Sequence, residues 1–153
     1  MTSLKTERLI LRPWPADDIA AITQGTRSTG WADDFPAEGD SVIAGILAEH
    51  PEILGQSQII ERASSLVVGS IGLFWPPTDG AVEIGYGIVA SRRGRGYAPE
   101  ATRALAEHAL TEPGVHTVFA NVELSNPPSV RVLEKAGFKR WSSDTSTARY
   151  HLQ

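Results

Sequence analysis

The sequence predicts a mixed α/β fold, with a mostly antiparallel central sheet flanked by helices, in a single domain spanning residues 1–153. Three observations favour it. Two strand-like runs separated by a brief turn follow one another over 56–75, which predicts two antiparallel strands. Only residues 81–124 have the strand-helix-strand order of a parallel crossover. No internal repeat, low-complexity tract or linker-like change in composition divides the chain.

The first half of the chain predicts two strands and two helices before the central sheet is complete. Residues 7–12, ERLILR, predict a short strand, and Pro13, Pro15 and Asp17 then open a helix that runs to about residue 24. A loop rich in glycine, acids and aromatics is expected at 25–40, followed by a helix at 41–54. Two antiparallel strands are expected at 57–63 and 65–75, the second ending at Pro76 and Pro77 before an Asp-Gly turn.

The strand expected at 81–89, AVEIGYGIV, has two different faces. Alternation places three apolar residues and a tyrosine on one face: Val82, Ile84, Tyr86 and Ile88. The other face carries a carboxylate and two glycines among small or apolar residues: Ala81, Glu83, Gly85, Gly87 and Val89. Because glycine weakens a strand, two glycines on one face favour close approach by a backbone or a ligand.

The remaining elements alternate between helix and strand. A helix is expected from about residue 98 to 110, with Ala101, Leu105 and Ala109 inward at i, i+4 spacing. Its outward positions are polar: Glu100, Arg103, Glu107 and Thr111. A strand is expected at 116–124, and a short helix at 126–138, opened by Asn126 and closed by Gly137. Residues 139–141 and 147–152 predict a last pair of strands.

Composition excludes several classes of function. The formal net charge of −4 argues against a general affinity for nucleic acid or an anionic membrane surface, so any basic site must be local. No apolar run approaches the length of a membrane span and the N-terminus lacks a signal-peptide core, so a cytoplasmic location is expected. The absence of cysteine excludes disulfides and a cysteine nucleophile. The four histidines lack close metal-ligand spacing, and no metal is expected.

The segment 91–98, SRRGRGYA, places three arginines and two glycines in six positions before a helix that has no Ser, Thr, Asp or Asn to cap it. Unpaired N–H groups at a helix start, next to glycines, predict an anion site. The Walker pattern fails because no lysine lies between positions 5 and 135. The dinucleotide fingerprint is weak, since its third glycine would fall at Pro99.

The spacing Arg93-x-x-Gly96-x-Ala98 resembles the acyl-CoA pyrophosphate loop of the GNAT superfamily of N-acyltransferases. Three further segments resemble the branch of that family that acetylates protein N-termini, including those of ribosomal proteins: TERLILRPW at 6–14, VEIGYGI at 82–88 and NPPSVRVLEKAGF at 126–138. The resemblance covers most of the chain except roughly residues 15–64. It implies a GNAT-like fold and direct transfer of an acetyl group from acetyl-CoA to an amine, without a metal.

The resemblance also implies residues that bind the cofactor. Backbone N–H groups across the loop would hold the pyrophosphate with assistance from arginine charge: Arg93, Gly94, Arg95, Gly96, Tyr97 and Ala98. Pro99 has no N–H to contribute. The backbone of Ile88 and Val89 would pair with the pantetheine arm. Asn126 either contacts the cofactor or caps the following helix, and an Asn before two prolines favours capping.

Two residues are candidates for acid-base chemistry. Glu83 is the expected base that keeps the amine neutral, with Glu123 as the second candidate and a solvated strand glutamate as the alternative. Leu133 stands where many relatives have a tyrosine that protonates the leaving thiolate. Ser129 is therefore the candidate donor, unless its hydroxyl bonds nearby backbone. Tyr86 and Tyr97 are expected to pack against the core or the helix start.

The acceptor is expected to bind residues of the unmatched stretch. Trp31, Asp33, Asp34 and Phe35 could hold an ammonium group by charge and an aromatic face, or form a solvated acidic loop with two anchoring rings. A peptide N-terminus, an amino acid, a polyamine or an aminoglycoside-like amine would each suit an acidic entrance. A monomer or a homodimer is expected.

Two other classes of function remain open from the sequence. The chain could be a non-catalytic acyl-CoA-binding or regulatory domain, which the leucine at position 133 permits. It could also be a folded module whose basic turn binds a partner's phosphate or acidic segment.

Overall fold

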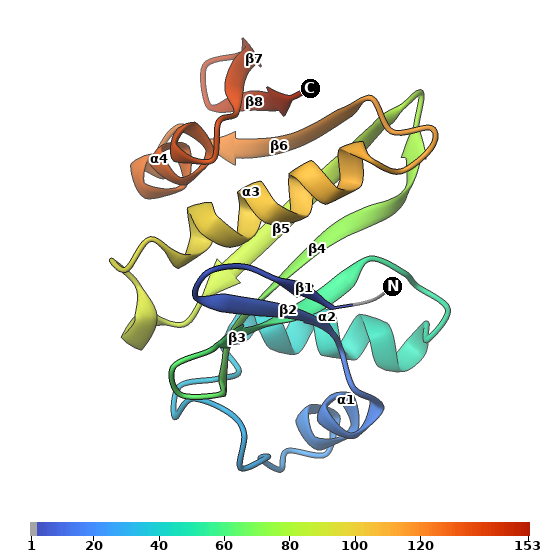
Figure 1. Ribbon diagram of the computed structural model, residues 1–153, viewed down its shortest axis with the longest axis vertical. Coiled ribbons are helices and arrows are strands. Elements are labelled where there is room, and N and C mark those ends of the chain that lie inside the picture. Colours follow the sequence, from blue (N-terminus) through green and yellow to red (C-terminus); the bar gives the residue numbers. More distant parts are fainter. Residues whose placement is uncertain (1–2) are drawn as a thin grey trace.

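The computed structural model describes residues 3–153 and contains one eight-stranded sheet in the order β1-β2-β3-β4-β5-β6-β8-β7 (Figure 1). The strands are β1 (Leu4–Lys5), β2 (Leu9–Pro13), β3 (Gln56–Glu61), β4 (Leu66–Thr78), β5 (Ala81–Ile88), β6 (Thr117–Glu123), β7 (Lys139–Ser143) and β8 (Thr147–Leu152). The helices are α1 (Ala16–Thr23), α2 (Glu38–Glu49), α3 (Tyr97–Leu110) and α4 (Pro127–Lys135), with a 3-10 turn, η1, at Ala90–Arg92. Among the strands of residues 3–153, only β5 and β6 pair in parallel, so the predicted mixed, mostly antiparallel sheet and its one crossover are confirmed.

Three predicted boundaries, of β4 and α2, are wrong for local reasons. β4 does not end at Pro76 but continues to Thr78, because the prolines lie in an irregular stretch between the Phe74–Glu83 and Thr78–Ala81 pairs, where ladder bonds are missing. α2 begins at Glu38 instead of residue 41, since the Asp40 side chain accepts the N–H of Ala37 (2.9 Å) at the helix start. It ends at Glu49 because the following proline, at position 51, disfavours helix in the residue before it.

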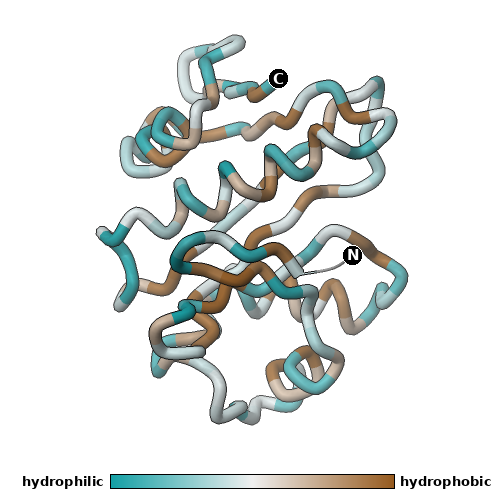
Figure 2. The backbone as a smooth tube through the Cα atoms, in the orientation of Figure 1, coloured by the Kyte–Doolittle hydropathy of each residue, from teal (hydrophilic) through white to brown (hydrophobic). Residues whose placement is uncertain are grey.

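The helices cover the two faces of the sheet. α3 crosses one face and contacts β2, β4, β5 and β6, while α1 and α2 pack together on the other (Figure 1). Ala101, Leu105 and Ala109 are fully buried, as predicted from their spacing. Glu100 was predicted to face outward from α3 but is only partly exposed, because its carboxylate accepts a hydrogen bond from the Thr6 hydroxyl at 2.6 Å. Hydrophobic residues concentrate along the central strands, and the loop before α3 is hydrophilic (Figure 2). None of the helices in 3–153 has the length and hydropathy needed to cross a membrane.

The sheet opens between its two parallel strands. β5 and β6 pair only at Ala81–Thr117, Val82–Val118 and Glu83–Phe119. Past that row, β5 continues to Ile88 and β6 to Glu123 without pairing to each other. β5 leads into η1 and α3, whereas β6 leads into α4. The gap therefore lies between the start of α3 and the start of α4.

Candidate functional site

The start of α3 is open to an anion. Gly94 (φ 79°) and Gly96 (φ 80°) adopt the left-handed conformation that glycine tolerates best, and no side chain caps the helix at Gly96. The backbone N–H groups of residues 94–98 make no hydrogen bond to the rest of 3–153. The N–H of Arg93 differs from the prediction, since it donates to the carbonyl of Ala90 at 3.3 Å. The donor set therefore begins at Gly94, and it suits a phosphate group.

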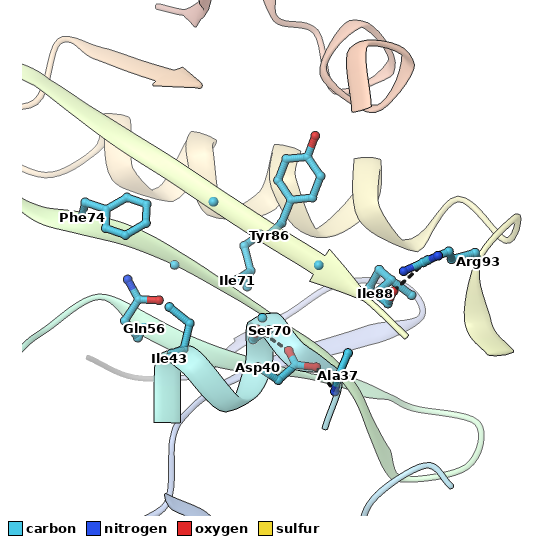
Figure 3. Close-up of a pocket in the computed structure, with 14 residues that line it drawn as sticks. Ala37, Asp40, Ile43, Gln56, Ser70, Ile71, Phe74, Tyr86, Ile88 and Arg93 are labelled. Carbon is cyan, nitrogen blue, oxygen red and sulfur yellow. Dashed lines mark hydrogen bonds between the residues drawn. The ribbon is translucent and has the colours of Figure 1, made fainter. Parts of the chain in front are cut away.

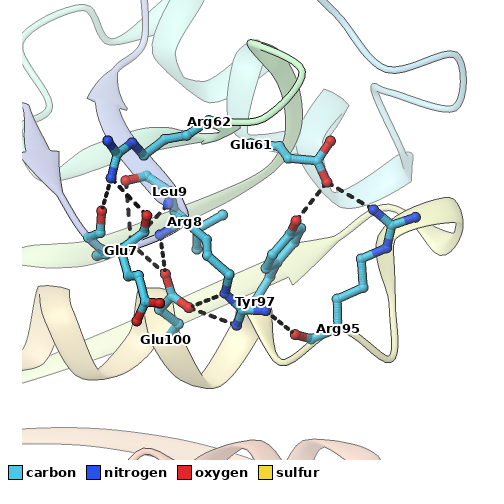
Figure 4. A network of polar contacts seen from close by, with 9 residues as sticks. Glu7, Arg8, Leu9, Glu61, Arg62, Arg95, Tyr97 and Glu100 are labelled. Carbon is cyan, nitrogen blue, oxygen red and sulfur yellow. Dashed lines mark hydrogen bonds and ion pairs between the residues drawn. The ribbon is translucent and has the colours of Figure 1, made fainter.

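Two of the three loop arginines are bound to a buried carboxylate. Glu61, at the end of β3, accepts hydrogen bonds from Arg95 Nη1 (3.1 Å) and the Tyr97 hydroxyl (2.8 Å) (Figure 4). It also accepts one from Arg92 Nε (3.2 Å). Burial raises the pKa of Glu61, but the hydrogen bonds from Ser64, Tyr97 and Arg92 and the charge of Arg92 outweigh it, so this pKa lies below its ordinary value. The charge of Arg92 and Arg95 is thus partly neutralised. Tyr97 is buried against the helix start, as predicted.

A second set of contacts fixes the same loop from Arg8, the residue directly before β2. Arg8 donates from Nη1 to the carbonyl of Arg95 (2.7 Å), and its Nη2 lies 2.7 Å from the Glu100 carboxylate (Figure 4). The Arg8 guanidinium also lies 4.9 Å from the centre of the Tyr97 ring, in a cation-π arrangement. The loop is therefore held in shape by Glu61 and Arg8, which reduces the entropy lost when a ligand binds.

The end of β5 directs backbone groups into the gap. The N–H of Val89 donates to Val68 on β4 (2.9 Å), and its carbonyl accepts the N–H of Arg92 (3.0 Å). The prediction that Val89 pairs with the pantetheine arm is therefore wrong, because both of its groups are bonded within the protein. Neighbouring residues on an antiparallel strand point their backbone groups to opposite sides, so the groups of Ile88 face away from β4. Arg93 Nε donates to the Ile88 carbonyl there at 3.0 Å (Figure 3).

A cavity of about 310 Å³ lies beside the glycine face of β5. It is lined by α2, β3, β4, β5 and the loop: Ala37, Gly39, Asp40, Ile43, Gln56, Ser70, Ile71, Gly72, Phe74, Gly85, Tyr86, Gly87, Ile88 and Arg93. The pairs Gly72–Gly85 and Ser70–Gly87 line it, and close approach of a ligand at Gly85 and Gly87 stays a prediction. Asp40 is buried in the wall and accepts a hydrogen bond from Ser70 (Figure 3). Burial raises the pKa of the Asp40 carboxyl above its ordinary value.

Glu83 lies where the gap begins. It occupies the last paired row of β5 and β6, opposite Phe119, and lines a second cavity of about 490 Å³. Phe74 lines both cavities, so Glu83 stands on the glycine-bearing side of β5, as predicted. Glu123 lines neither cavity and is about 13 Å farther along β6, at roughly 3.3 Å per residue. The geometry favours Glu83 over Glu123.

A pair of hydroxyl groups spans the gap. The Tyr86 hydroxyl lies 2.9 Å from Ser129 Oγ and 3.3 Å from the Ser129 carbonyl, which joins β5 to the first turn of α4. Burial raises the pKa of Tyr86, opposed by the hydrogen bond with Ser129. The ring leaves β5 on the side away from Asp40 (Figure 3). Tyr86 was expected only to pack against the core. A phenol hydroxyl on a half-buried strand face needs a polar partner, and this requirement could have indicated a hydrogen bond such as the one to Ser129.

The helix-capping prediction for Asn126 is confirmed. Its side-chain oxygen accepts the backbone N–H of Ser129 at 3.4 Å. The side-chain nitrogen makes no hydrogen bond within 3–153, so contact with a cofactor stays a prediction for that atom. Leu133 is buried and carries no polar group into the gap.

The predicted acceptor residues are divided by the structure. Trp31 is 4% exposed and Phe35 is fully buried, with ring centres 5.4 Å apart, so the prediction that these rings hold an ammonium group is wrong. Residues 30–32 bond to Val67 on β4, which places the aromatics in the core. Asp34 accepts the hydroxyl and N–H of Ser91, and these bonds lower the pKa of Asp34. Asp33 is exposed.

An uncapped helix start that suits an anion therefore lies beside a gap in the sheet. Residues 8–139 match the family described as "Acetyltransferase (GNAT) domain", and the chain therefore belongs to the GNAT acetyltransferase family. Within residues 3–153, no group of three or more His, Asp or Glu side chains could hold a metal ion.

Known proteins resemble the chain over most of its length. The "Uncharacterized N-acetyltransferase YnaD" of Bacillus subtilis (strain 168) is 26% identical over 141 residues, which cover 90% of this chain and 82% of that protein. A GNAT-family acetyltransferase structure from Bacillus anthracis has a TM-score of 0.76 at 22% identity, covering 98% of this chain and 97% of its own. The dodecameric spermidine N-acetyltransferase from Vibrio cholerae has a TM-score of 0.69 at 15% identity, covering 96% and 94%. These last two likenesses concern the fold.

Proposed function

We propose that the protein transfers an acetyl group from acetyl-CoA to a primary amine by direct transfer in a ternary complex. The observation that carries the proposal is the gap past Glu83, in which the Ile88 carbonyl faces away from β4 next to an uncapped helix start. A strand edge needs hydrogen-bonding partners and a helix start favours an anion. The amide-bearing arm and the pyrophosphate of acetyl-CoA have these two properties in the same order.

The chain's own groups fit this cosubstrate. The N–H groups of residues 94–98 suit the pyrophosphate, and Pro99, which follows them, has no N–H to add. Arg93 is the loop arginine that does not bind Glu61. Arg93 Nε donates a hydrogen bond to the Ile88 carbonyl at the gap. When the cosubstrate binds, an amide N–H of its arm would take the place of Arg93 as the donor to this carbonyl. The Asn126 side-chain nitrogen lies at the start of α4 as a further donor. The loop is anchored before any ligand binds.

The reactive groups are divided between the two sides of β5. Acetyl-CoA supplies an activated acetyl group that a neutral amine attacks, with the CoA thiolate as the leaving group. Glu83 accepts the proton of the attacking amine, directly or through water, at the vertex of the gap. The Tyr86–Ser129 pair supplies a hydroxyl proton on the α4 side, where the leaving sulfur must be neutralised. No residue of the chain needs to carry the acetyl group, and no cysteine is present to do so.

The decisive experiment is a thiol-release assay with acetyl-CoA and a panel of peptides, amino acids, polyamines and aminoglycosides. The chain has no cysteine, so every thiol detected comes from CoA. We expect acceptor-dependent release at a rate above the hydrolysis of acetyl-CoA alone. Calorimetric binding of acetyl-CoA without release for any acceptor would contradict the catalytic proposal and favour an acyl-CoA-binding role.

The loop itself is tested by Gly94→Asp, with Gly114→Asp as the control. Both glycines have positive φ (79° and 88°), and a side chain at either would meet open space, so both variants carry a similar backbone strain of about 1–2 kcal/mol. Only the first places a carboxylate among the anion-binding N–H groups. We expect acetyl-CoA affinity to fall by about tenfold or more in that variant alone. Gly96 is a poorer choice, since a Cβ there would lie 3.3 Å from the Arg8 guanidinium. Equal affinity in both variants would refute the loop assignment.

A further inference from the structure

The second cavity combines opposite charges with an apolar wall. Its lining residues are Phe74, Pro76, Thr78, Asp79, Ala81, Glu83, Phe119 and Arg149. Asp79 is exposed at the turn between β4 and β5, where solvent screens its charge. Glu83 and Arg149 are only partly exposed, on strands that flank β6 on either side.

Arg149 is held in place but leaves most of its donors free. Its guanidinium carbon lies 3.7 Å from the centre of the Phe119 ring, and its Nε donates to His151 Nε2 at 3.0 Å. The His151 ring in turn stacks on Trp141, with centres 4.6 Å apart and planes 7° apart. The two Nη groups of Arg149 make no hydrogen bond or ion pair within 3–153. A planar guanidinium fixed in this way suits a carboxylate, which it can bind through two parallel hydrogen bonds.

Glu83 and Arg149 lie on opposite sides of one ring. Glu83 is paired with Phe119 across β5 and β6, and Arg149 reaches the same ring from β8. The two outer strands are about 10 Å apart, because each neighbouring pair is separated by roughly 4.8 Å. No ion pair joins the two residues, and Glu83 makes no polar contact within 3–153. A ligand that carries both charges would satisfy both residues.

We propose that the acceptor bound here is an apolar amine that also carries a carboxylate, such as an apolar α-amino acid. The inference rests on the proposed function and names the acceptor class of that site. The amine faces Glu83, the carboxylate binds the Nη groups of Arg149, and the apolar part packs on Phe74, Pro76 and Phe119. A polyamine brings a second positive charge toward Arg149 in place of the carboxylate. Like-charge repulsion therefore discriminates against polyamines.

The test compares amines that differ only in the carboxylate. The pairs are L-phenylalanine with 2-phenylethylamine and L-leucine with 3-methylbutylamine, with spermidine and a leucine-initiated tripeptide as further acceptors. The variants are Arg149→Gln and a control, Arg140→Gln, whose arginine also lies over an aromatic ring (Tyr150, 5.8 Å) but lines no described cavity. Binding of N-acetyl-L-phenylalanine and of N-acetyl-2-phenylethylamine is measured by calorimetry in parallel. Melting temperatures show whether the variants are folded, and Arg149→Lys provides a second variant that keeps the charge.

We expect the wild type to favour each carboxylated acceptor in kcat/KM by about tenfold or more. Arg149→Gln should remove that preference by lowering only the carboxylated member, Arg149→Lys should restore part of it, and Arg140→Gln should keep it. N-acetyl-L-phenylalanine should bind the wild type and lose affinity only in the Arg149 variants.

Equal or better use of the amines that lack a carboxylate, or an unchanged preference in Arg149→Gln, would overturn the inference while the proposed function stands. If no acceptor releases thiol, the proposed function fails. Calorimetric binding of N-acetyl-L-phenylalanine then still tests whether the second cavity binds a carboxylate through Arg149. Failure of N-acetyl-L-phenylalanine to bind the wild type would then overturn the inference as well.

Discussion

Glu61 is the buried contact point of the cofactor loop, and Glu61→Gln tests whether it holds that loop. The carboxylate accepts hydrogen bonds from Ser64 (2.6 Å), Tyr97, Arg92 and Arg95. Glutamine keeps the shape of the side chain but retains only one acceptor oxygen and directs an NH₂ group at other donors. The variant therefore loses about two charge-assisted hydrogen bonds, worth roughly 1.5–3 kcal/mol each when buried.

The expected loss of folding free energy is about 2–4 kcal/mol. This value lies below the additive sum of about 3–6 kcal/mol because the Arg95 side chain is 51% exposed, and solvent screens its share. For a chain of this size, each kcal/mol lowers the melting temperature by roughly 2–4 °C. We thus expect a decrease of about 4–16 °C, together with faster hydrogen exchange of the amides in residues 92–97.

The same variant has a pH signature. The folded-state pKa of Glu61 is lowered, so its stabilising contribution is present above the unfolded pKa and is lost as pH falls through the folded value. The difference in unfolding free energy between wild type and Glu61→Gln should therefore be largest near neutral pH and should shrink below about pH 4. Urea denaturation at several pH values measures it.

The control is Glu107→Gln, at an exposed glutamate paired with Arg103 one turn away on α3. Their side chains are 58% and 63% exposed, and such a pair contributes about 0.5 kcal/mol or less. The reasoning is refuted if Glu61→Gln loses no more stability than this control, or if the loop amides exchange at the wild-type rate.

Two predictions concern the chemical step. Glu83→Gln should lower turnover by about 10²-fold or more at pH values where the acceptor amine is mostly protonated, and by less at alkaline pH. Glu123→Gln is the control. Parallel pH–rate profiles for wild type and Glu83→Gln would exclude Glu83 as the base. Tyr86→Phe and Ser129→Ala should each lower kcat by about tenfold or more while acetyl-CoA affinity is preserved, at a stability loss of roughly 0.5–1.5 kcal/mol. A lower melting temperature with unchanged kcat would instead assign the pair a purely structural role.

The fold was largely predictable because its strands and helices have strong local patterns. The two-face reading of β5 gave the correct side for both Glu83 and the glycines. The buried positions of α3 followed from helical spacing. Errors appeared where tertiary contacts override local signals, as at Pro76, which lies in a bulged stretch of β4 where a ladder hydrogen bond is not required.

The acceptor residues could not be predicted in the same way. Residues 30–40 contain acids and aromatics that read equally as a binding loop or as an anchored one. The hydrogen bonds to Val67 decide between them by placing Trp31 against the edge of β4 that β5 has left. Arg149 and Phe119 form a cavity only because β8 pairs with β6 in a register that brings the two side chains together. The local sequence pattern of a strand predicts neither its pairing partner nor the register of that pairing.

The loop arginines show how a motif and a fold divide a single function. The spacing Arg93-x-x-Gly96-x-Ala98 correctly indicated a helix start without a cap, which is a local property of the backbone. The resemblance also implied that Arg93 and Arg95 assist in binding the anion, but Glu61, more than thirty positions earlier, binds Arg95 together with Arg92. Those two ion pairs shape the loop, whereas Arg93 remains beside the gap and contacts Ile88. Arginines that look equivalent in the sequence therefore have different roles, because β3 ends next to one side of the loop and β5 next to the other.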